Sequence, residues 1–381
     1  MKRLTHALSP LALLLASCGA PASGDSPPAA ATPAVVPQAE APFTVTEIAR
    51  FEEPWAMAFL PGTPLALVTE RKGRLLLWEE GGEVREVTGV PPMDYGGQGG
   101  LGDVAVRMVT QGGAPRPMVY LSWAEAGAGD TRGAAAGRAW LALDGQPRLE
   151  GLDVFWRQSP KVTGRGHYSH RFAFSPDGAE LFLASGDRQK MAPAQDPASD
   201  LGKIFRFGIG NPDRVTDARV TVSMGHRNML GLAFDAQGRL WALEHGPRGG
   251  DELNLVRQGA NYGWPLVSQG DHYDGRAIPR HATRPDLAPP ALSWNPVIAP
   301  GGMVIYRGDL FPQWRGQALI AALGAQGLVR VAIEGDTPAR EVARYDLGTR
   351  IRAIAEREDG SIWLLEDGPG ARLLRLTPRE R

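Results

Sequence analysis

The chain has 381 residues, of which 43% are hydrophobic and 22% are charged, and its 41 basic residues nearly balance its 42 acidic ones. This balance argues against a nucleic-acid-binding protein, which needs a basic patch or stripe, and the ordinary apolar fraction argues against a disordered chain. The 48 glycines and 32 prolines make up about 21% of the residues, against about 12% in average usage, which argues against helical bundles and coiled coils. A large, turn-rich, all-β protein remains.

The first 17 residues have the features of an export signal. Met1-Lys2-Arg3 is basic, and residues 8–16 form an apolar run far shorter than the roughly 18 residues that span a membrane. Leu15-Ala16-Ser17-Cys18 resembles the lipobox of bacterial lipoprotein signals, which are cut before a cysteine that then receives diacylglycerol and an N-acyl group. We therefore expect a signal peptide over 1–17 and a membrane anchor at Cys18, the only cysteine of the chain.

Residues 18–42 are expected to be the lipidated cysteine and a tether. More than half of residues 19–42 are Ala or Pro, and few large apolar side chains are present, so this stretch buries too little surface to fold. The folded domain is then expected over 43–381. Gly19, rather than Asp, follows the cysteine, which favours the outer membrane and the periplasmic side of the cell envelope.

Short apolar runs that follow Asp- or Gly-containing turns recur through the domain. Such turns lie at 72–73, 177–178, 237–238 and 359–360. The last three are separated by about 61 and 122 residues, one and two steps of a single period, and about 340 residues hold five or six such units. A long repeat of several strands predicts a β-propeller, whose blades are four-stranded sheets and whose functional loops surround one mouth of a central channel.

Several loops carry polar groups that strand turns do not explain. His167 and Asp187 stand at opposite ends of one expected hairpin, and a histidine oriented by a carboxylate is a general base near neutral pH. A lone loop histidine is more often structural, so both interpretations stay open. Arg227, Arg350 and Arg352 would match an anion if they converged, whereas most arginines are solvated surface residues.

Glu244, Asp251 and Glu252 lie among carbonyl-rich Gly and Pro turns and are candidates to supply oxygen ligands for a hard cation such as calcium. No EF-hand spacing supports that site. A second glycine cluster, at 96–102, surrounds Gln98 and would let the backbone approach a flat ligand.

The residues of these loops together resemble a known family. Residues 246–254, followed by Asn261-Tyr262-Gly263-Trp264-Pro265, resemble the signature of the glucose/sorbosone dehydrogenase family. The closer resemblance is to its soluble aldose sugar dehydrogenases, which use pyrroloquinoline quinone (PQQ). Further matching segments follow in the family's order, at 97–101, 166–167, 186–187, 225–228, 301–303, 311–316 and 350–352. The resemblance covers about 45–378 and implies an all-β fold, a six-bladed β-propeller with four-stranded antiparallel blades.

The resemblance also implies an activity and roles for single residues. It implies a quinoprotein that oxidises an aldose at its anomeric carbon to the lactone and passes the hydride to PQQ, with calcium as a Lewis acid. His167 matches the base that takes the anomeric proton, Asp187 the carboxylate that orients it, and Arg227 the arginine beside the quinone carbonyl. The implied cofactor contacts are Gln98, His167, Arg227, Asn228, Gly302, Arg350 and Arg352. The implied calcium ligands are Gly246 and Pro247 near the quinone, and Glu252 with the Tyr262 carbonyl at a second, structural site.

Two departures from the family pattern affect the expected site. Family members usually place a cofactor-binding lysine after the strand at 318–323, where this chain has Gly324-Ala325-Gln326 and where Arg330 is a candidate substitute. His170 stands where a small residue is usual, so it would narrow or repolarise the sugar site.

Two other functions remain compatible with the sequence. A calcium-dependent lactonase on a similar propeller would also need a cation and a His or Asp base, but not three converging arginines. A propeller that binds ligands without catalysis would explain the missing lysine. The expected partners are an aldose, an electron acceptor of unknown identity and the membrane at Cys18, with no nucleic acid, and the chain is expected to be a monomer or homodimer.

Overall fold

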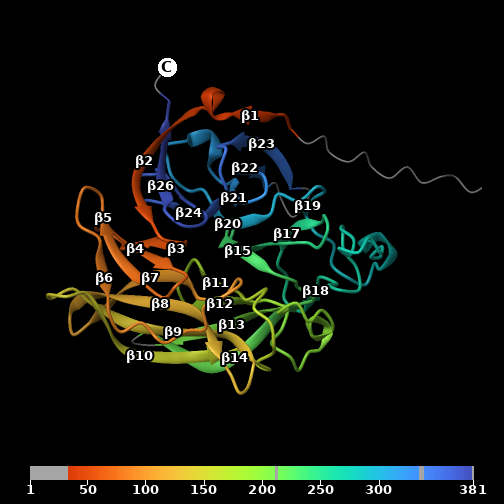
Figure 1. The fold of residues 1–381 in the computed structure, drawn as a ribbon, viewed down its shortest axis with the longest axis horizontal. Coiled ribbons are helices and arrows are strands. Elements are labelled where there is room, and N and C mark those ends of the chain that lie inside the picture. Colours follow the sequence, from red (N-terminus) through yellow and green to blue (C-terminus); the bar gives the residue numbers. More distant parts are fainter. Residues whose placement is uncertain (1–32, 211–212, 334–338, 380–381) are drawn as a thin grey trace, which may run out of the picture. The chain divides into compact units, whose positions relative to one another are not determined.

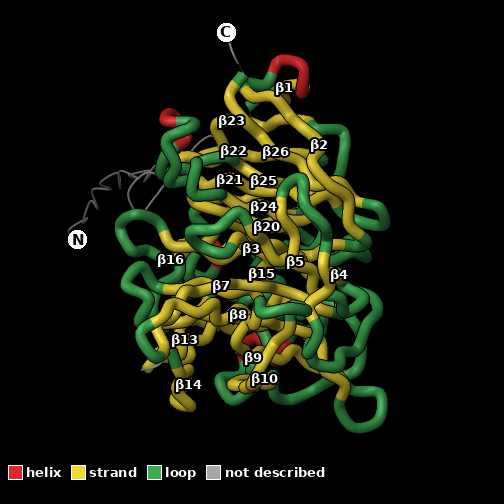
Figure 2. Tube along the Cα trace, turned by 90° about the vertical axis from the view of Figure 1, so that its left-hand side faces the viewer, coloured by secondary structure: helices red, strands yellow, loops and turns green. Residues whose placement is uncertain are grey.

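Strands make up nearly all the regular structure of the protein. The computed structural model describes residues 33–210, 213–333 and 339–379, so the predicted signal peptide and Cys18 lie outside the described residues. Within these ranges, helices occur only as four 3-10 turns: η1 (Gln38–Glu40), η2 (Ala192–Gln195), η3 (His281–Thr283) and η4 (Pro312–Trp314) (Figure 2). None of the described helices is long and apolar enough to cross a membrane.

The described strands form six small sheets, each of which is one blade (Figure 1). The first three blades follow one another along the chain. Blade 1 contains β3 (Pro54–Phe59), β4 (Leu65–Glu70), β5 (Leu75–Glu79) and β6 (Arg85–Val87). Blade 2 contains β7 (Leu101–Gln111), β8 (Ala114–Ala126), β9 (Arg132–Ala142) and β10 (Arg148–Arg157). Blade 3 contains β11 (Ser169–Phe174), β12 (Glu180–Ser185), β13 (Lys203–Gly210), β14 (Arg214–Met224) and the short β18 (Ala260–Asn261).

The last three blades complete the ring. Blade 4 contains β15 (Met229–Phe234), β16 (Leu240–Glu244), β17 (Asp251–Leu255) and β19 (Leu292–Trp294). Blade 5 contains β20 (Pro300–Ile305), β21 (Ala318–Ala322), β22 (Gly327–Ala332), β23 (Arg340–Asp346) and β1 (Val35–Pro37). Blade 6 contains β24 (Ile351–Glu356), β25 (Ile362–Glu366), β26 (Ala371–Pro378) and β2 (Phe43–Phe51).

The inner strands of the six blades, β3, β7, β11, β15, β20 and β24, each lie beside the next around a ring (Figure 1). The predicted six-bladed β-propeller is therefore confirmed. The turns at 177–178, 237–238 and 359–360 occupy the same place in blades 3, 4 and 6, between the first and second strands. The turn at 72–73 lies one hairpin later, between β4 and β5, because the first turn of blade 1 is at 61–64.

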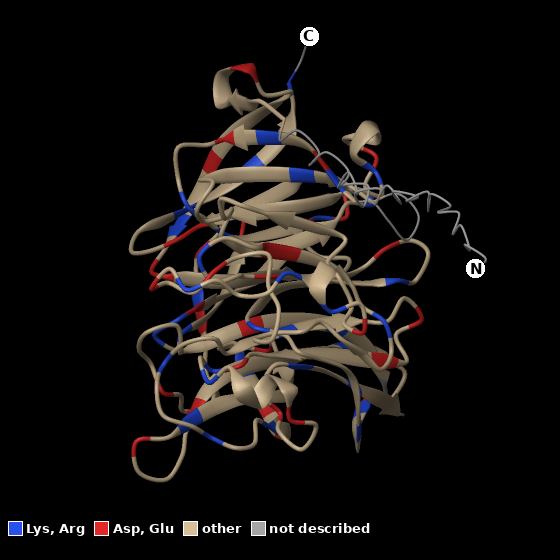
Figure 3. Cartoon of the chain, turned by 90° about the vertical axis from the view of Figure 1, so that its right-hand side faces the viewer, with Lys and Arg blue, Asp and Glu red and all other residues tan. Residues whose placement is uncertain are grey.

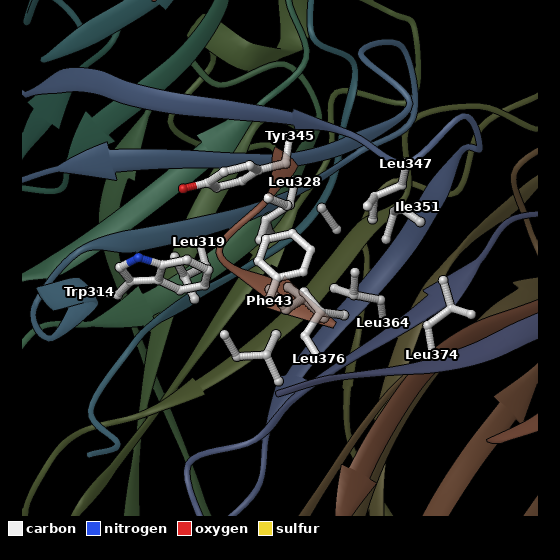
Figure 4. Close-up of a cluster of buried hydrophobic side chains, with 14 of the residues drawn as sticks. Phe43, Trp314, Leu319, Leu328, Tyr345, Leu347, Ile351, Leu364, Leu374 and Leu376 are labelled. Atoms are coloured by element: carbon white, nitrogen blue, oxygen red, sulfur yellow. The ribbon is translucent and has the colours of Figure 1, made fainter. Parts of the chain in front are cut away.

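The ring is closed by a strand from the other end of the chain. β2 pairs antiparallel with β26, so Phe43 lies opposite Pro378 and the N-terminal strand becomes the outer strand of the last blade. The Phe43 ring packs edge-on against Trp314 and Tyr345 of blade 5, with centroids 5.9 and 5.1 Å apart, in an apolar cluster that also holds Leu374 (Figure 4). Burial of large apolar side chains across this seam stabilises the closed ring.

Part of the expected tether is ordered. Val35–Pro37 form β1, which pairs in parallel with β23, and Val36 packs against the apolar cluster of blades 5 and 6. The two valines give this short segment the apolar side chains that the rest of the tether sequence lacks. Basic and acidic residues are mixed along the blades in the view of Figure 3, in keeping with the near-zero net charge.

All six inner strands are irregular where they begin. Each inner strand pairs with the second strand of its blade, and the register of this pairing shifts after its first residue pair. The shifts lie between residues 54/56, 101/104, 169/172, 229/231, 300/302 and 351/353 of the inner strands. Such bulges turn side chains away from the regular alternation and are frequent beside active sites. One end of the propeller channel is therefore surrounded by six bulged strand starts, and the polar loops found in the sequence lead into them.

Candidate active site

The largest group of predicted site residues lines one cavity at this end of the channel. The cavity has a volume of about 310 Å³, and the predicted residues on its wall are Gln98, His167, Arg227, Asn228, Arg350 and Arg352. Asp187 lies behind His167 and is fully buried. Gly302 is not on this wall but lines a separate cavity of about 140 Å³ among the inner strands.

His167 and Asp187 form a buried hydrogen-bonded pair. The His167 ring lies with Nδ1 2.7 Å from Asp187 Oδ1, and Asp187 also accepts hydrogen bonds from Trp264 Nε1 at 2.7 Å and from the Gln189 backbone N–H at 2.8 Å. The backbone N–H of His167 donates to Gln98 Oε1 at 2.7 Å, which ties the ring to the glycine cluster. The carboxylate is held from three sides, so it fixes the orientation of the imidazole.

The electrostatics of the pair favour a neutral histidine and an ionised aspartate. Burial raises the pKa of Asp187, but its hydrogen bond to His167 and the charge of Arg227 outweigh burial and hold this pKa below its ordinary value. Burial lowers the pKa of His167 more than the contact with Asp187 raises it. The ionised carboxylate makes Nδ1 the protonated nitrogen, so Nε2 is left to accept a proton.

The backbone around His167 is in a sparsely populated conformation. His167, Ser169 and His170 have φ values of +50°, +58° and +48°, in the left-handed region that side chains other than glycine rarely adopt. Each such residue costs about 1–3 kcal/mol and persists only where surrounding contacts demand it, most often at functional sites. The strained run is what brings the His167 side chain to the cavity wall at the start of β11.

Several partners hold Arg227 in place. Its backbone N–H donates to Glu244 Oε2 at 2.7 Å, while Nη1 donates to the His245 carbonyl and Nη2 to Tyr273 Oη, both at 3.2 Å. The guanidinium also lies over the Trp264 ring, 5.2 Å from its centroid. Arg227 Nε is buried and has no hydrogen-bond partner among the described residues, so this donor is left for a ligand or water.

Arg350 and Arg352 share one carboxylate. Asp367 accepts from Arg350 Nε at 3.0 Å and from Arg352 Nε at 2.8 Å, and all three side chains line the cavity. Two positive charges on one negative charge leave an excess positive charge at this wall. The three predicted arginines therefore converge, and the cavity has the character of an anion site.

The expected substitute for the missing lysine lies elsewhere. Arg330 stacks on Trp314, 5.1 Å from the ring centroid, with Nη1 3.3 Å from Tyr345 Oη, and it does not line the cavity. Its position on β22 places it in the seam between blades 5 and 6, where it packs against the aromatic cluster. Apolar Leu323 lines the cavity just before the segment where the family lysine is expected.

His170 forms part of the cavity wall as a buried, neutral ring. It stacks on Trp55 with centroids 5.0 Å apart, and its Nδ1 lies 2.6 Å from Ser122 Oγ. Burial and the nearby Arg171 charge lower the pKa of His170 to about 3. The His170 ring occupies the space that Gly102 leaves open, since a Cβ on residue 102 would lie 1.7 Å from His170 Cε1.

The structure adds wall residues that sequence reasoning missed. These are Trp55, Arg71, His245 and Tyr273. Arg71 Nη2 donates to the Gly97 carbonyl, and its guanidinium lies 5.5 Å from the Tyr95 ring centroid. Arg71 follows β4 directly and has no motif of its own. His245 directly precedes the motif at 246–254, and Trp264 lies within the motif at 261–265, but neither had an expected role.

The four predicted calcium ligands line a neighbouring cavity of about 10 Å³, room for a single small ion or water. Asp251 shapes it, because its carboxylate accepts from the backbone N–H groups of Gly246 at 2.9 Å and Ala299 at 2.7 Å. Glu252 is buried close to Glu244, and burial and this like charge raise the pKa of Glu252 well above its ordinary value. The Tyr262 carbonyl lies 3.0 Å from His281 Nε2.

Comparison with known proteins identifies the family. The family model described as Glucose / Sorbosone dehydrogenase matches residues 51–375. The chain belongs to this family. The resemblance found in the sequence is thus confirmed, and the family's sugar dehydrogenase activity makes the protein an oxidoreductase.

Relatives from the family cover most of the chain. The aldose sugar dehydrogenase YliI of Escherichia coli (strain K12) is 34% identical over 343 residues, which cover 87% of this chain and 91% of that protein. The crystal structure of the soluble aldose sugar dehydrogenase from Escherichia coli in the apo form matches with a TM-score of 0.78 and 32% identity, over 88% of this chain and 100% of the other. The PQQ-bound aldose sugar dehydrogenase from Streptomyces coelicolor matches with a TM-score of 0.69 and 25% identity, over 92% and 100%.

Proposed function

We propose that the protein is a PQQ- and calcium-dependent dehydrogenase that oxidises an aldose at its anomeric carbon to the lactone. The observation that carries this proposal is the convergence of the His167–Asp187 pair and three arginines on one cavity. A base and an anion site in one cavity suit the removal of a proton from a sugar beside an anionic cofactor. The PQQ in the Streptomyces coelicolor relative supports the choice of cofactor.

The residues present fit a flat quinone that carries carboxylates. The cavity volume of about 310 Å³ is at the lower end of the range for small-molecule sites. Arg350 and Arg352 would pair with cofactor carboxylates, and the unpartnered Nε of Arg227 supplies a buried donor. The remaining cofactor contacts proposed at this wall are Gln98, His167 and Asn228, with Gly302 assigned from the family resemblance alone.

The proposed chemistry divides between cofactor and protein. When bound, PQQ supplies a quinone that accepts the hydride from the anomeric carbon. His167 Nε2 takes the proton of the anomeric hydroxyl, and Asp187 stabilises the imidazolium that forms. Arg227 presents its positive charge and its free Nε donor where negative charge develops.

Calcium is proposed at the small cavity and the turn beside it. The oxygen atoms of Glu244 are engaged by His226, Asn254 and the Arg227 backbone, whereas Glu252 lies buried beside this negative charge. A hard cation would offset two buried carboxylates, and oxygen donors are what calcium prefers. The cavity has room for one of the two proposed ions. Glu252 and the Tyr262 carbonyl would hold the structural ion there, and the Gly246 and Pro247 carbonyls would hold the other ion outside this space, nearer the cofactor.

The proposal includes a place in the cell. We propose that the protein is exported and anchored through lipidated Cys18 on the periplasmic side of the outer membrane, as the lipobox-like segment indicates. A Cys18→Ser variant is expected to appear in the soluble periplasmic fraction. Equal membrane retention of this variant would contradict the anchor.

Reconstitution tests the proposed reaction. Protein purified without cofactor is supplied with PQQ and calcium, and the reduction of a dye is followed with a panel of aldoses. We expect turnover for the wild type. For His167→Ala we expect that PQQ still binds, held by the arginines, and that kcat falls by about 10²–10⁴-fold. Lactone hydrolysis without PQQ would favour a lactonase, PQQ uptake without turnover would favour a binding propeller, and neither uptake nor turnover would refute the proposal.

A further inference from the structure

One aromatic side chain at the cavity wall is almost fully in solvent. Tyr273 is 73% exposed, more than the other large hydrophobic or aromatic side chains of the described residues, and yet it lines the cavity with His167 and Arg227. A ring this exposed contributes little to the core, so its contacts at the cavity wall are the feature that sets it apart.

The loop that carries Tyr273 is braced against the turn at 248–250. Arg248 and Asp271 exchange both backbone hydrogen bonds, at 2.9 and 3.0 Å. Below this bridge the two loops touch backbone to backbone, since a Cβ on Gly250 would lie 2.3 Å from Gly270 N and a Cβ on Gly270 would lie 2.2 Å from the Gly249 carbonyl oxygen. Only glycine allows this approach on both sides.

The tip of the same loop is a tight turn. The His272 N–H donates to the Arg276 carbonyl and the Gly275 N–H donates to the His272 carbonyl, both at 2.9 Å. Arg280 closes the base of the loop with an ion pair to Asp271 at 2.8 Å. Tyr273 therefore stands on a supported hairpin rather than on a free segment.

The tyrosine is also fixed from inside the cavity. Its Oη accepts a hydrogen bond from Arg227 Nη2 at 3.2 Å, and the Arg227 guanidinium lies 5.9 Å from the ring centroid. This contact holds the exposed ring at the cavity wall, beside Arg227 and in the same cavity as His167.

We propose that Tyr273 is a stacking platform for the aldose ring and a determinant of which sugars are accepted. The proposal rests on the proposed function and names how its substrate is recognised. A pyranose ring presents hydroxyl groups at its edge and C–H groups on its faces, so a flat aromatic ring can cover one face while polar residues bind the edge. Gln98 and Arg227 supply polar groups on the same wall.

The platform makes a prediction about specificity. The tyrosine ring covers only one face of the sugar. Aldoses that present only C–H groups on that face should therefore bind more tightly than aldoses with an axial hydroxyl group there. Removing the ring should therefore level the KM values of such epimers, and should leave the affinity for PQQ unchanged.

The test compares three variants of the full chain. Tyr273→Ala removes the ring, Tyr273→Phe keeps the ring and removes the bond to Arg227, and Leu266→Ala is the matched control. Leu266 is 43% exposed on the same loop and does not line the cavity. KM and kcat are measured with several aldoses, and the PQQ dissociation constant is measured by quenching of tryptophan fluorescence.

For Tyr273→Ala we expect a KM about tenfold higher, with kcat and PQQ affinity within about threefold of the wild type. Tyr273→Phe is expected to keep the wild-type order of KM values among the sugars, with a small loss in kcat, and Leu266→Ala to match the wild type. An unchanged KM in Tyr273→Ala would overturn the platform, and weaker PQQ binding in step with KM would show that the ring covers the cofactor instead. A wild type that binds PQQ but oxidises no aldose would refute the proposed function itself, and the platform with it.

Discussion

Replacing Asp187 with asparagine tests the role of the buried pair without changing its shape. The carboxylate is fully buried and accepts from His167, Trp264 and Gln189, so the side chain cannot turn away. An amide in this place must direct its NH₂ group at one of three fixed donors. Turned towards His167, it would stabilise the tautomer in which Nε2 carries the hydrogen and cannot act as a base.

The size of the effect follows from the lost charge. When His167 takes a proton it becomes an imidazolium beside the carboxylate, with Nδ1 2.7 Å from Oδ1. Unit charges about 4 Å apart attract each other by about 4 kcal/mol at an effective dielectric constant of 20. Because 1.36 kcal/mol corresponds to a tenfold change in rate, Asp187→Asn should lower kcat by about 10³-fold.

The assay is steady-state dye reduction by the PQQ-loaded variant, with PQQ affinity and thermal unfolding as controls for the fold. Asp177→Asn, in the exposed turn between β11 and β12 of the same blade, is the matched control and should keep wild-type turnover. A kcat for Asp187→Asn within tenfold of the wild type, with normal cofactor binding, would refute the assignment of His167 as the base.

Three further predictions concern the same site. Because burial holds the pKa of His167 below its ordinary value of 6.5 and only the neutral ring accepts a proton, kcat/KM should rise with pH in the acidic range and be level by pH 7, as a pH profile would show. Arg352→Ala should raise the PQQ dissociation constant about 10–100-fold in a fluorescence titration. Asp367→Ala should raise this constant less, because both arginines keep their charge and lose only the carboxylate that orients them. Glu252→Gln should abolish the rise in melting temperature that calcium is expected to give the wild type; an equal rise in both proteins would exclude Glu252 as a ligand.

Much of the fold could be predicted because blades repeat. The turns at 177–178, 237–238 and 359–360 fall at equivalent places in three blades, so their spacing measured the size of a blade. The closure of the ring by β2 could not be found in this way, because β2 looks like any other strand and its partner β26 lies at the far end of the chain. The pairing of β1 with β23 is hidden for the same reason within a Pro-rich stretch.

The candidate site shows a similar division. Motifs in sequence order pointed to Gln98, His167 and Arg227, and the structure brings these side chains to one wall. Tyr273 was missed because it stands in a loop without a recognised motif, and its place depends on backbone contacts with a different loop. The links from Trp264 to both Asp187 and Arg227 likewise depend on directions of side chains that spacing does not determine.

The closing strand also bears on how and when the molecule can form. Phe43 and Pro378 pair across more than 300 residues of intervening chain, about as long a loop as this polypeptide can close. While the chain is being synthesised, β2 has no partner until β26 has left the ribosome, so the ring stays open until the last blade is complete. Because this pairing forms last, no earlier folding intermediate can close the ring of blades. The same delay exposes an unpaired strand edge, so a copy truncated before β26 should aggregate through β2 rather than fold as a smaller propeller.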